Sequence, residues 1–186
     1  TWGTSFLFIK IALDDLHPAT LVALRLTVGM LTLLAVTRWY KLSLPRQWAV
    51  WQHLFIVGAL GVAIPFVLIS WAEQQMDSGL TAVLNSTVPL FSIVIAGVWL
   101  KQETVTKGKI VGLVIGFLGV VLLFARELQV GGGNAAAPLA VVLAGLLYAM
   151  SAAYARHHLH HVSPIVTATG QVAAACLLAW IIALFS

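Results

Sequence analysis

The chain has 186 residues, of which 61% are apolar and 9% charged, and its formal net charge is +4. A soluble domain is about one quarter charged, so this composition excludes an ordinary soluble protein and indicates a polytopic membrane protein. The excess of Lys and Arg is therefore interpreted as a topology signal, and we expect no nucleic-acid partner. Cys176 is the single cysteine and cannot form an internal disulfide, so we expect it to be a packing residue.

Seven apolar segments follow one another along the chain. The first ends at Leu13 and is about half a span, whereas a helix needs roughly 20 residues to cross a bilayer. The others are 19–37, 51–72 with Pro65 inside it, 79–100, 110–125, 139–155 and 165–186. The first residues already have the character of a helix interior and there is no initial Met, so we expect a truncated chain. The fold class that follows is an all-α membrane protein, a polytopic helical bundle truncated to about seven spans.

The loops between these segments alternate in charge. One set holds Arg38, Lys41, Arg46, Lys101, Lys107, Lys109 and Arg156, and the other holds Asp14, Asp15, Glu73, Asp77, Arg126 and Glu127. By the positive-inside rule we expect the basic loops in the cytoplasm, and Trp39, Trp48, Trp51 and Trp99 at the cytoplasmic boundary. The short loops and the absence of a visible targeting sequence favour a bacterial inner (plasma) membrane.

The fourth segment carries a polar cluster well inside an apolar span. Asn85, Ser86 and Thr87 precede Pro89, which cannot donate the backbone hydrogen bond that the Asn85 carbonyl would accept. Polar groups at membrane depth must face protein or water. Asn85, Ser86 and Pro89 are therefore substrate-site candidates, and the alternative is a proline kink healed within the helix.

An internal repeat appears when the chain is shifted by 146 residues. The pairs that coincide include Ser5 and Ser151, Leu13 and Leu159, Pro18 and Pro164, Leu31 and Leu177, and the aromatic pair Trp2 and Tyr148. Five spans separate the copies, so the second copy enters the membrane in the opposite orientation. Inverted repeats are typical of secondary transporters, whose substrate site lies near the midplane between the copies.

The order and spacing of several short motifs resemble the drug/metabolite transporter superfamily, in particular its EamA type. The motifs are Trp2-Gly3-Thr4-Ser5-Phe6 with Lys10, Pro18 with Leu24-Arg25-Leu26, Ser78-Gly79-Leu80-Thr81-Ala82 with Pro89-Leu90, Glu103, Lys107-Gly108 and Gly116-Phe117-Leu118-Gly119-Val120. The resemblance implies ten helices in two inverted five-helix repeats. It also implies a first repeat at 1–127, a Gly-rich linker at 128–138, and the first two helices of an incomplete second repeat at 139–186.

Three further residues are substrate-site candidates. Trp2 and Tyr148 occupy matching depths near the midplane in the two copies, where two aromatic groups can flank a solute; ordinary helix packing is the alternative. Arg25 lies about 10 Å below Pro18 at helical rise, where it either pairs with an acid such as Glu73 or lines a cavity suited to a carboxylate. Lys10 is one turn from Asp14 near a helix end, which favours a structural role.

Other polar residues carry weaker signals. Glu103 is interpreted as a salt-bridge or capping residue among lysines. The cluster His157, His158, His160 and His161 has no Cys or carboxylate beside it, so we expect a solvated loop without a metal. Gly108, Gly112 and Gly116 form a small-residue stripe that serves either internal helix packing or a homodimer.

These observations predict a secondary transporter that exports amino acids, metabolites or drug-like small organic solutes by alternating access. Its expected partners are a small-molecule solute and the lipid bilayer, and no cofactor or enzymatic activity is expected. The alternatives are a non-transporting membrane scaffold and, less favoured, a membrane-embedded enzyme, for which no nucleophile-and-base pair is visible within the spans. The deep carboxylate of a proton-driven antiporter is not evident either, because Glu73 is expected at the edge of its span.

Overall fold

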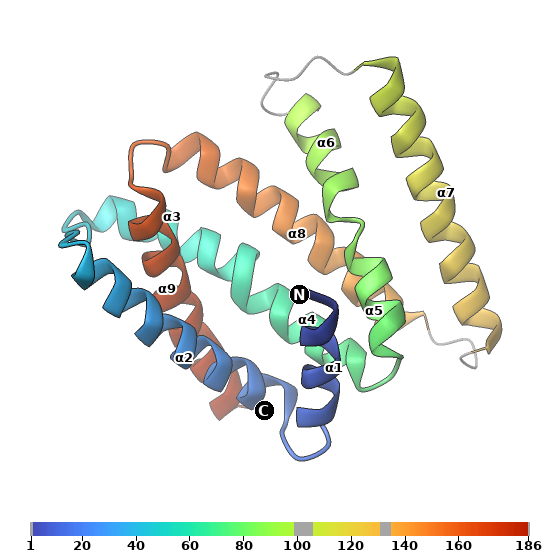
Figure 1. Cartoon of the computed structure of the whole chain (residues 1–186), viewed down its shortest axis with the longest axis horizontal. Coiled ribbons are helices and arrows are strands. Elements are labelled where there is room, and N and C mark those ends of the chain that lie inside the picture. The colour runs from blue at the N-terminus through green and yellow to red at the C-terminus, as the bar shows by residue number, and fades with distance from the viewer. Residues whose placement is uncertain (1, 99–105, 131–134, 186) are drawn as a thin grey trace.

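The computed structural model describes residues 2–98, 106–130 and 135–185, without the side chains at 2–4, 98, 107, 124 and 126–130. Within these ranges every regular element is a helix (Figure 1). The elements are α1 (Trp2–Ala12), α2 (Pro18–Trp39), α3 (Trp48–Gly58), the π-helix η1 (Ala59–Ala63), α4 (Ile64–Glu73), α5 (Ser78–Asn85), α6 (Val88–Val98), α7 (Lys107–Val130), α8 (Ala136–His158) and α9 (Pro164–Leu184). The predicted all-α architecture is confirmed.

Five helical segments in the described part of the chain are long and apolar enough to cross a membrane. They are Pro18–Trp39, Trp48–Glu73, Ser78–Gly97, Ala136–His158 and Pro164–Leu184. Helix α7 contains a shorter apolar stretch, Gly108–Leu123, and α1 is an apolar helix of 11 residues. The prediction of a polytopic helical membrane protein is therefore confirmed.

Two of the long segments are interrupted near their prolines. In the third segment the π-helix η1 ends just before Pro65, as expected where a residue without an N–H disturbs the i→i−4 hydrogen bonds. In the fourth segment α5 ends at Asn85, and α6 begins at Val88 directly before Pro89. The break predicted at each proline is thus present, and each one changes the direction in which the following side chains point.

Helices α2 and α9 pack along each other in opposite directions. The Thr37 hydroxyl lies 2.7 Å from that of Thr169 near one end of the pair, and Thr27 contacts both Cys176 and Trp180 toward the other. Cys176 is buried in the apolar cluster between them, in the packing role predicted for it. The two helices begin at Pro18 and Pro164, 146 residues apart, which agrees with the predicted internal repeat.

The loops divide the bundle into two ends with different charge. The acidic end has the turns 13–17 and 74–77, with Asp14, Asp15 and Asp77. The basic end has the loops 40–47 and 159–163, with Lys41 and Arg46. Trp39 and Trp48 stand at the basic end with 83% and 68% of their surface exposed, where a boundary tryptophan is expected. Trp99 lies outside the described residues.

Helix α7 stands at the edge of the bundle beside α6 (Figure 1). Of the predicted glycine stripe, Gly116 faces the Leu90 side chain of α6, so a Cβ there would meet it at 2.8 Å, whereas Gly108 and Gly112 face open space. One glycine therefore serves internal packing, and a homodimer through the other two stays a prediction. Helix α7 continues to Val130 and α8 begins at Ala136, so helix extends into both sides of the predicted linker at 128–138.

The contact between α3 and α9 depends on a glycine. A Cβ on Gly58 would lie 2.6 Å from the Gln171 carbonyl oxygen and 3.1 Å from the Ala175 nitrogen, both backbone atoms of α9. Neither atom moves without shifting the helix. We therefore expect Gly58→Ala to lower the stability of the full-length protein in detergent by about 1–3 kcal/mol, measured by thermal denaturation. Gly112→Ala is the matched control because nothing lies near its Cβ. Equal stability of the two variants would contradict this packing.

Candidate functional site

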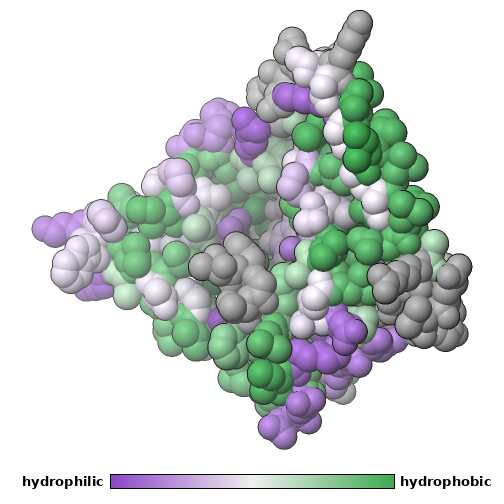
Figure 2. Space-filling model, turned by 45° about the vertical axis from the view of Figure 1, so that its right-hand side comes forward, coloured by the Kyte–Doolittle hydropathy of each residue, from purple (hydrophilic) through white to green (hydrophobic). Residues whose placement is uncertain are grey.

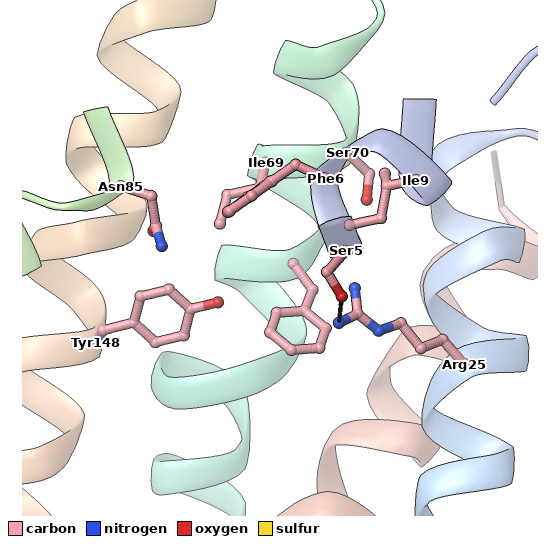
Figure 3. Close-up of a pocket in the computed structure, with 9 residues that line it drawn as sticks. Ser5, Phe6, Ile9, Arg25, Ile69, Ser70, Asn85 and Tyr148 are labelled. Atoms are coloured by element: carbon pink, nitrogen blue, oxygen red, sulfur yellow. Dashed lines mark hydrogen bonds between the residues drawn. The ribbon is translucent and has the colours of Figure 1, made fainter. Parts of the chain in front are cut away.

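A small cavity lies at the meeting point of five helices (Figure 3). Its volume is about 20 Å³, on the scale of a single water molecule. The side chains that line it are Ser5, Phe6 and Ile9 from α1, Arg25 from α2, Phe66, Ile69 and Ser70 from α4, Asn85 from α5, and Tyr148 from α8. Three of the predicted site residues, from three different helices, are therefore brought together.

Arg25 reaches the cavity from α2. Its guanidinium carbon lies 4.8 Å from the centre of the Phe66 ring, within the range of a cation–π interaction. Its Nη2 donates a long hydrogen bond of 3.5 Å to the Ser5 hydroxyl. Of the two roles predicted for Arg25, the structure has the cavity-lining one, because the carboxylate of Glu73 has no hydrogen-bond partner among the described residues. Among the side chains that the structure describes, this one weak hydroxyl contact leaves most of the guanidinium N–H groups available to an anion.

Asn85 lies at the point where α5 ends, and its amide points toward the cavity and Tyr148 (Figure 3). Its Oδ1 atom is buried and has no hydrogen-bond partner in the described part of the chain. An acceptor left in this state costs about 1–3 kcal/mol, so a native protein keeps one where water or a ligand satisfies it. The polar cluster in an apolar span was the sequence signal that identified this residue.

Phe66 links the two sides of the cavity. Tyr148 meets its ring edge-on, with centroids 6.4 Å apart and an angle of 71° between the planes, while Arg25 lies over the same ring. Figure 3 shows Arg25 and Ser5 on one side and Asn85 and Tyr148 on the other. Sequence reasoning missed Phe66, although its position directly after Pro65 in an interrupted span was an available signal.

Two of the predicted residues point away from the cavity. The Ser86 side chain is exposed and its hydroxyl donates to the Val83 carbonyl at 2.5 Å, while Pro89 is exposed. The buried residue of this turn is Thr87, whose Oγ1 has no partner among the described residues and which packs against Gly145 of α8. The side chain of Trp2 is outside the described residues, so its predicted role stays a prediction.

Lys10 has the structural role expected of it, with a different partner. Its Nζ donates to the backbone carbonyls of Glu73 at 2.6 Å and Met76 at 2.9 Å, where α4 ends. A cation at this position satisfies carbonyls that lack helical partners and interacts favourably with the helix dipole. The predicted neighbour, Asp14, takes no part in these bonds. Lys10 therefore connects α1 to the end of α4 at the acidic end.

The histidine cluster is only partly a loop, because His157 and His158 form the last turn of α8, and the half-buried His158 takes part in ring stacking. His158 stacks on Tyr154 with centroids 4.1 Å apart, and on His53 of α3 at 4.7 Å. The Tyr154 hydroxyl lies 2.8 Å from His53 Nδ1. In the ranges that the structure describes, no three His, Cys, Asp or Glu side chains are grouped as metal ligands would be. Glu103 lies outside those ranges.

A larger groove adjoins the cavity on the surface between α1 and α2. It has a volume of about 360 Å³, and Ser5, Ile9 and Arg25 line both the groove and the cavity. The space-filling view also shows a hollowed face, with polar side chains at its base and hydrophobic ones on either side (Figure 2). Three side chains thus border both the small cavity and a wider space.

Comparisons with known proteins agree with this architecture. A family profile described as the EamA-like transporter family matches residues 1–125. An uncharacterized transporter of Archaeoglobus fulgidus is 32% identical over 122 residues, which are 66% of this chain and 43% of that protein. The uncharacterized transporter YoaV of Bacillus subtilis is 27% identical over 170 residues, 88% of this chain and 56% of that protein.

A probable terminal-alkyne amino-acid exporter of Streptantibioticus cattleyicolor is 30% identical over 135 residues, which are 73% of this chain and 43% of that protein. The chain thus spans about half the length of the curated relatives it matches. No solved structure matches it. The interrupted apolar helices, the polar cavity between them and the matched profile lead to one conclusion: the chain belongs to the EamA-like transporter family of membrane transporters.

Proposed function

We propose that this protein exports amino acids or related small organic solutes by alternating access, and that the cavity between α1, α2, α4, α5 and α8 is its solute site. The observation that carries the proposal is the convergence of Arg25, Asn85 and Tyr148 on one enclosed space in an apolar bundle. A scaffold has no need of such a space. The transporter names of the relatives favour a carrier over an enzyme.

The chemistry of the cavity suits a zwitterion. The Arg25 guanidinium offers donors to a carboxylate, and the unpartnered Asn85 Oδ1 offers an acceptor to an ammonium group. Phe6, Ile9 and Ile69 provide the apolar surface that a side chain of the solute needs. The amino-acid exporter named among the relatives has a cargo of this class, which supports the proposal.

Transport requires this site to open, because 20 Å³ does not hold an amino acid. The shared residues Ser5, Ile9 and Arg25 suggest that α1 moves away from α2 and joins the cavity to the adjacent groove. The breaks at η1 and between α5 and α6 allow parts of these spans to change direction without unfolding. The closed cavity is then the occluded state of the cycle.

We also propose the inner (plasma) membrane as the location, with the basic end in the cytoplasm. The charge difference between the two ends supports this orientation. Export then moves solute from the basic end toward the acidic end.

The first prediction concerns the amide acceptor. In vesicles containing the full-length protein, we expect Asn85→Leu to reduce uptake of radiolabelled leucine roughly ten- to a hundredfold, because a hydrogen bond to a charged group contributes about 1.5–3 kcal/mol. Val83→Leu is the matched control, since Val83 is exposed on the same helix. Wild-type activity in a fully inserted Asn85→Leu protein would refute this site.

A second prediction separates the two charged ends of the solute. If Arg25 binds the carboxylate, Arg25→Gln should raise the KM for leucine at least tenfold, while the KM for its decarboxylated analogue 3-methylbutylamine changes little. The two KM values are compared within the same variant, so the expression level does not affect the comparison. An equal loss for both compounds would assign Arg25 to helix packing.

A third prediction tests the orientation. Asp15→Cys and Lys41→Cys each add one exposed thiol, at the acidic end and the basic end respectively, while the native Cys176 stays buried. In intact cells, an impermeant maleimide should label the Asp15→Cys protein, and it should label the Lys41→Cys protein after permeabilisation alone. The reverse pattern would invert the proposed topology.

A further inference from the structure

Glu73 is the last residue of α4, and its side chain is completely buried. Both carboxylate oxygens are inaccessible and have no hydrogen-bond partner among the described residues. The sequence places this residue at the edge of its span, next to the turn 74–77, where a solvated carboxylate is expected. Glu73 does lie at the end of its span, as expected, but the structure encloses its side chain there instead of leaving it solvated.

Apolar packing accounts for this burial. Ala72 and Met76, on either side of Glu73 in the sequence, belong to an apolar cluster that also contains Leu84 of α5 and Ala137, Ala140 and Val141 of α8. Two residues of this cluster thus flank Glu73 in the sequence, and none of the surface of Glu73 is exposed. Water therefore has no contact with Glu73 in this conformation.

The cations near Glu73 are both committed elsewhere. The ionisable side chains of the elements packed on α4, at this end of the bundle and within the described residues, are Lys10 of α1, Arg25 of α2 and Tyr148 of α8. Lys10 and Arg25 lie close enough for electrostatic attraction, yet Lys10 donates to the carbonyls of Glu73 and Met76, and Arg25 lies on Phe66 and Ser5. Helix α5 has no ionisable side chain. Asp77, in the turn between α4 and α5, is exposed.

An ionised carboxylate without a donor or water is strongly disfavoured, whereas a carboxylic acid in the same place is neutral. We propose that Glu73 is a proton-binding site of the transport cycle: it takes a proton from water when the acidic end is open, keeps it in this closed conformation and releases it when the basic end opens. The inference deepens the proposed function and rests on it. It supplies the buried acid that a proton-coupled carrier requires.

Lys10 connects the two states. In the closed state its three donors hold the carbonyls at the end of α4, which fixes α1 against that helix. When α1 moves, Lys10 leaves these carbonyls and water reaches the carboxyl group. With the acidic end open, the carboxylate, which then has Lys10 or solvent as its partner, takes a proton from water on that side. Return to the closed state encloses this proton, and its release to water on the basic side, when that end opens, completes the exchange of one proton moved inward for solute moved outward.

The direct test needs no solute. Infrared spectra of the full-length protein in liposomes report the C=O stretch of a protonated carboxyl group. At neutral pH, the difference between wild type and Glu73→Gln should contain this band, and the difference between wild type and Asp77→Asn should lack it. Glutamine has the shape of the protonated acid, so folding is preserved, and equal melting temperatures verify this. A Glu73 that is ionised at neutral pH in the folded protein would overturn the proposal.

A transport arm separates this inference from the proposed function. With leucine as the probe, the Glu73→Gln protein should exchange leucine for leucine at near wild-type rates. Its rate of net leucine export driven by a pH gradient should be at least tenfold lower than that of wild type. Net export equal to wild type would overturn the proton site. If wild type carries no leucine, that cargo assignment fails while the infrared result still decides the proton site.

Discussion

Hydrogen bonding of the backbone in an apolar environment is the constraint on which this structure depends. A helix that crosses a bilayer can be interrupted only where protein or enclosed water satisfies the freed groups. The two interruptions here, at η1 and between Asn85 and Val88, both lie within the bundle. A side chain next to each one, Phe66 and Asn85 respectively, lines the same cavity. The site therefore exists because two spans are imperfect helices placed against each other.

The regular helices supply the frame that the interrupted helices need. Helix α2 is held along α9 by the apolar cluster and by the threonine pair Thr37 and Thr169, and this fixes the height at which Arg25 enters the bundle. Helix α8 packs on α4 and α6 and brings Tyr148 to the same level. Since these contacts join segments far apart in the sequence, with Pro18 and Pro164 separated by 146 residues and Phe66 and Tyr148 by 82, the site forms only when the whole bundle has assembled.

Sequence reasoning was reliable where it depended on composition and chain chemistry. Hydropathy located the spans and prolines located the breaks. Polar residues in apolar spans led to Arg25 and Asn85, and the internal repeat led to Tyr148; these three side chains line one cavity. It was unreliable where the outcome depended on rotation about a helix axis. Ser86 and Thr87 are neighbours of similar polarity, and the geometry of the turn alone decides that Thr87 is buried and Ser86 exposed. Glu73 illustrates the same limit, because its place at the end of a span does not reveal that its side chain is fully buried in the folded bundle.

The two polar sites of the bundle share helix α1. Ser5, Phe6 and Ile9 of this short helix line the proposed solute cavity, and Lys10, one residue further, donates to the carbonyls at the end of α4, including that of Glu73. A movement of α1 large enough to admit a solute must therefore also break the Lys10 contacts, since residues 9 and 10 belong to one rigid helical turn. Solute access and access to the buried carboxyl group are then geometrically linked without any direct contact between solute and proton. This linkage is what a carrier needs in order to exchange one for the other.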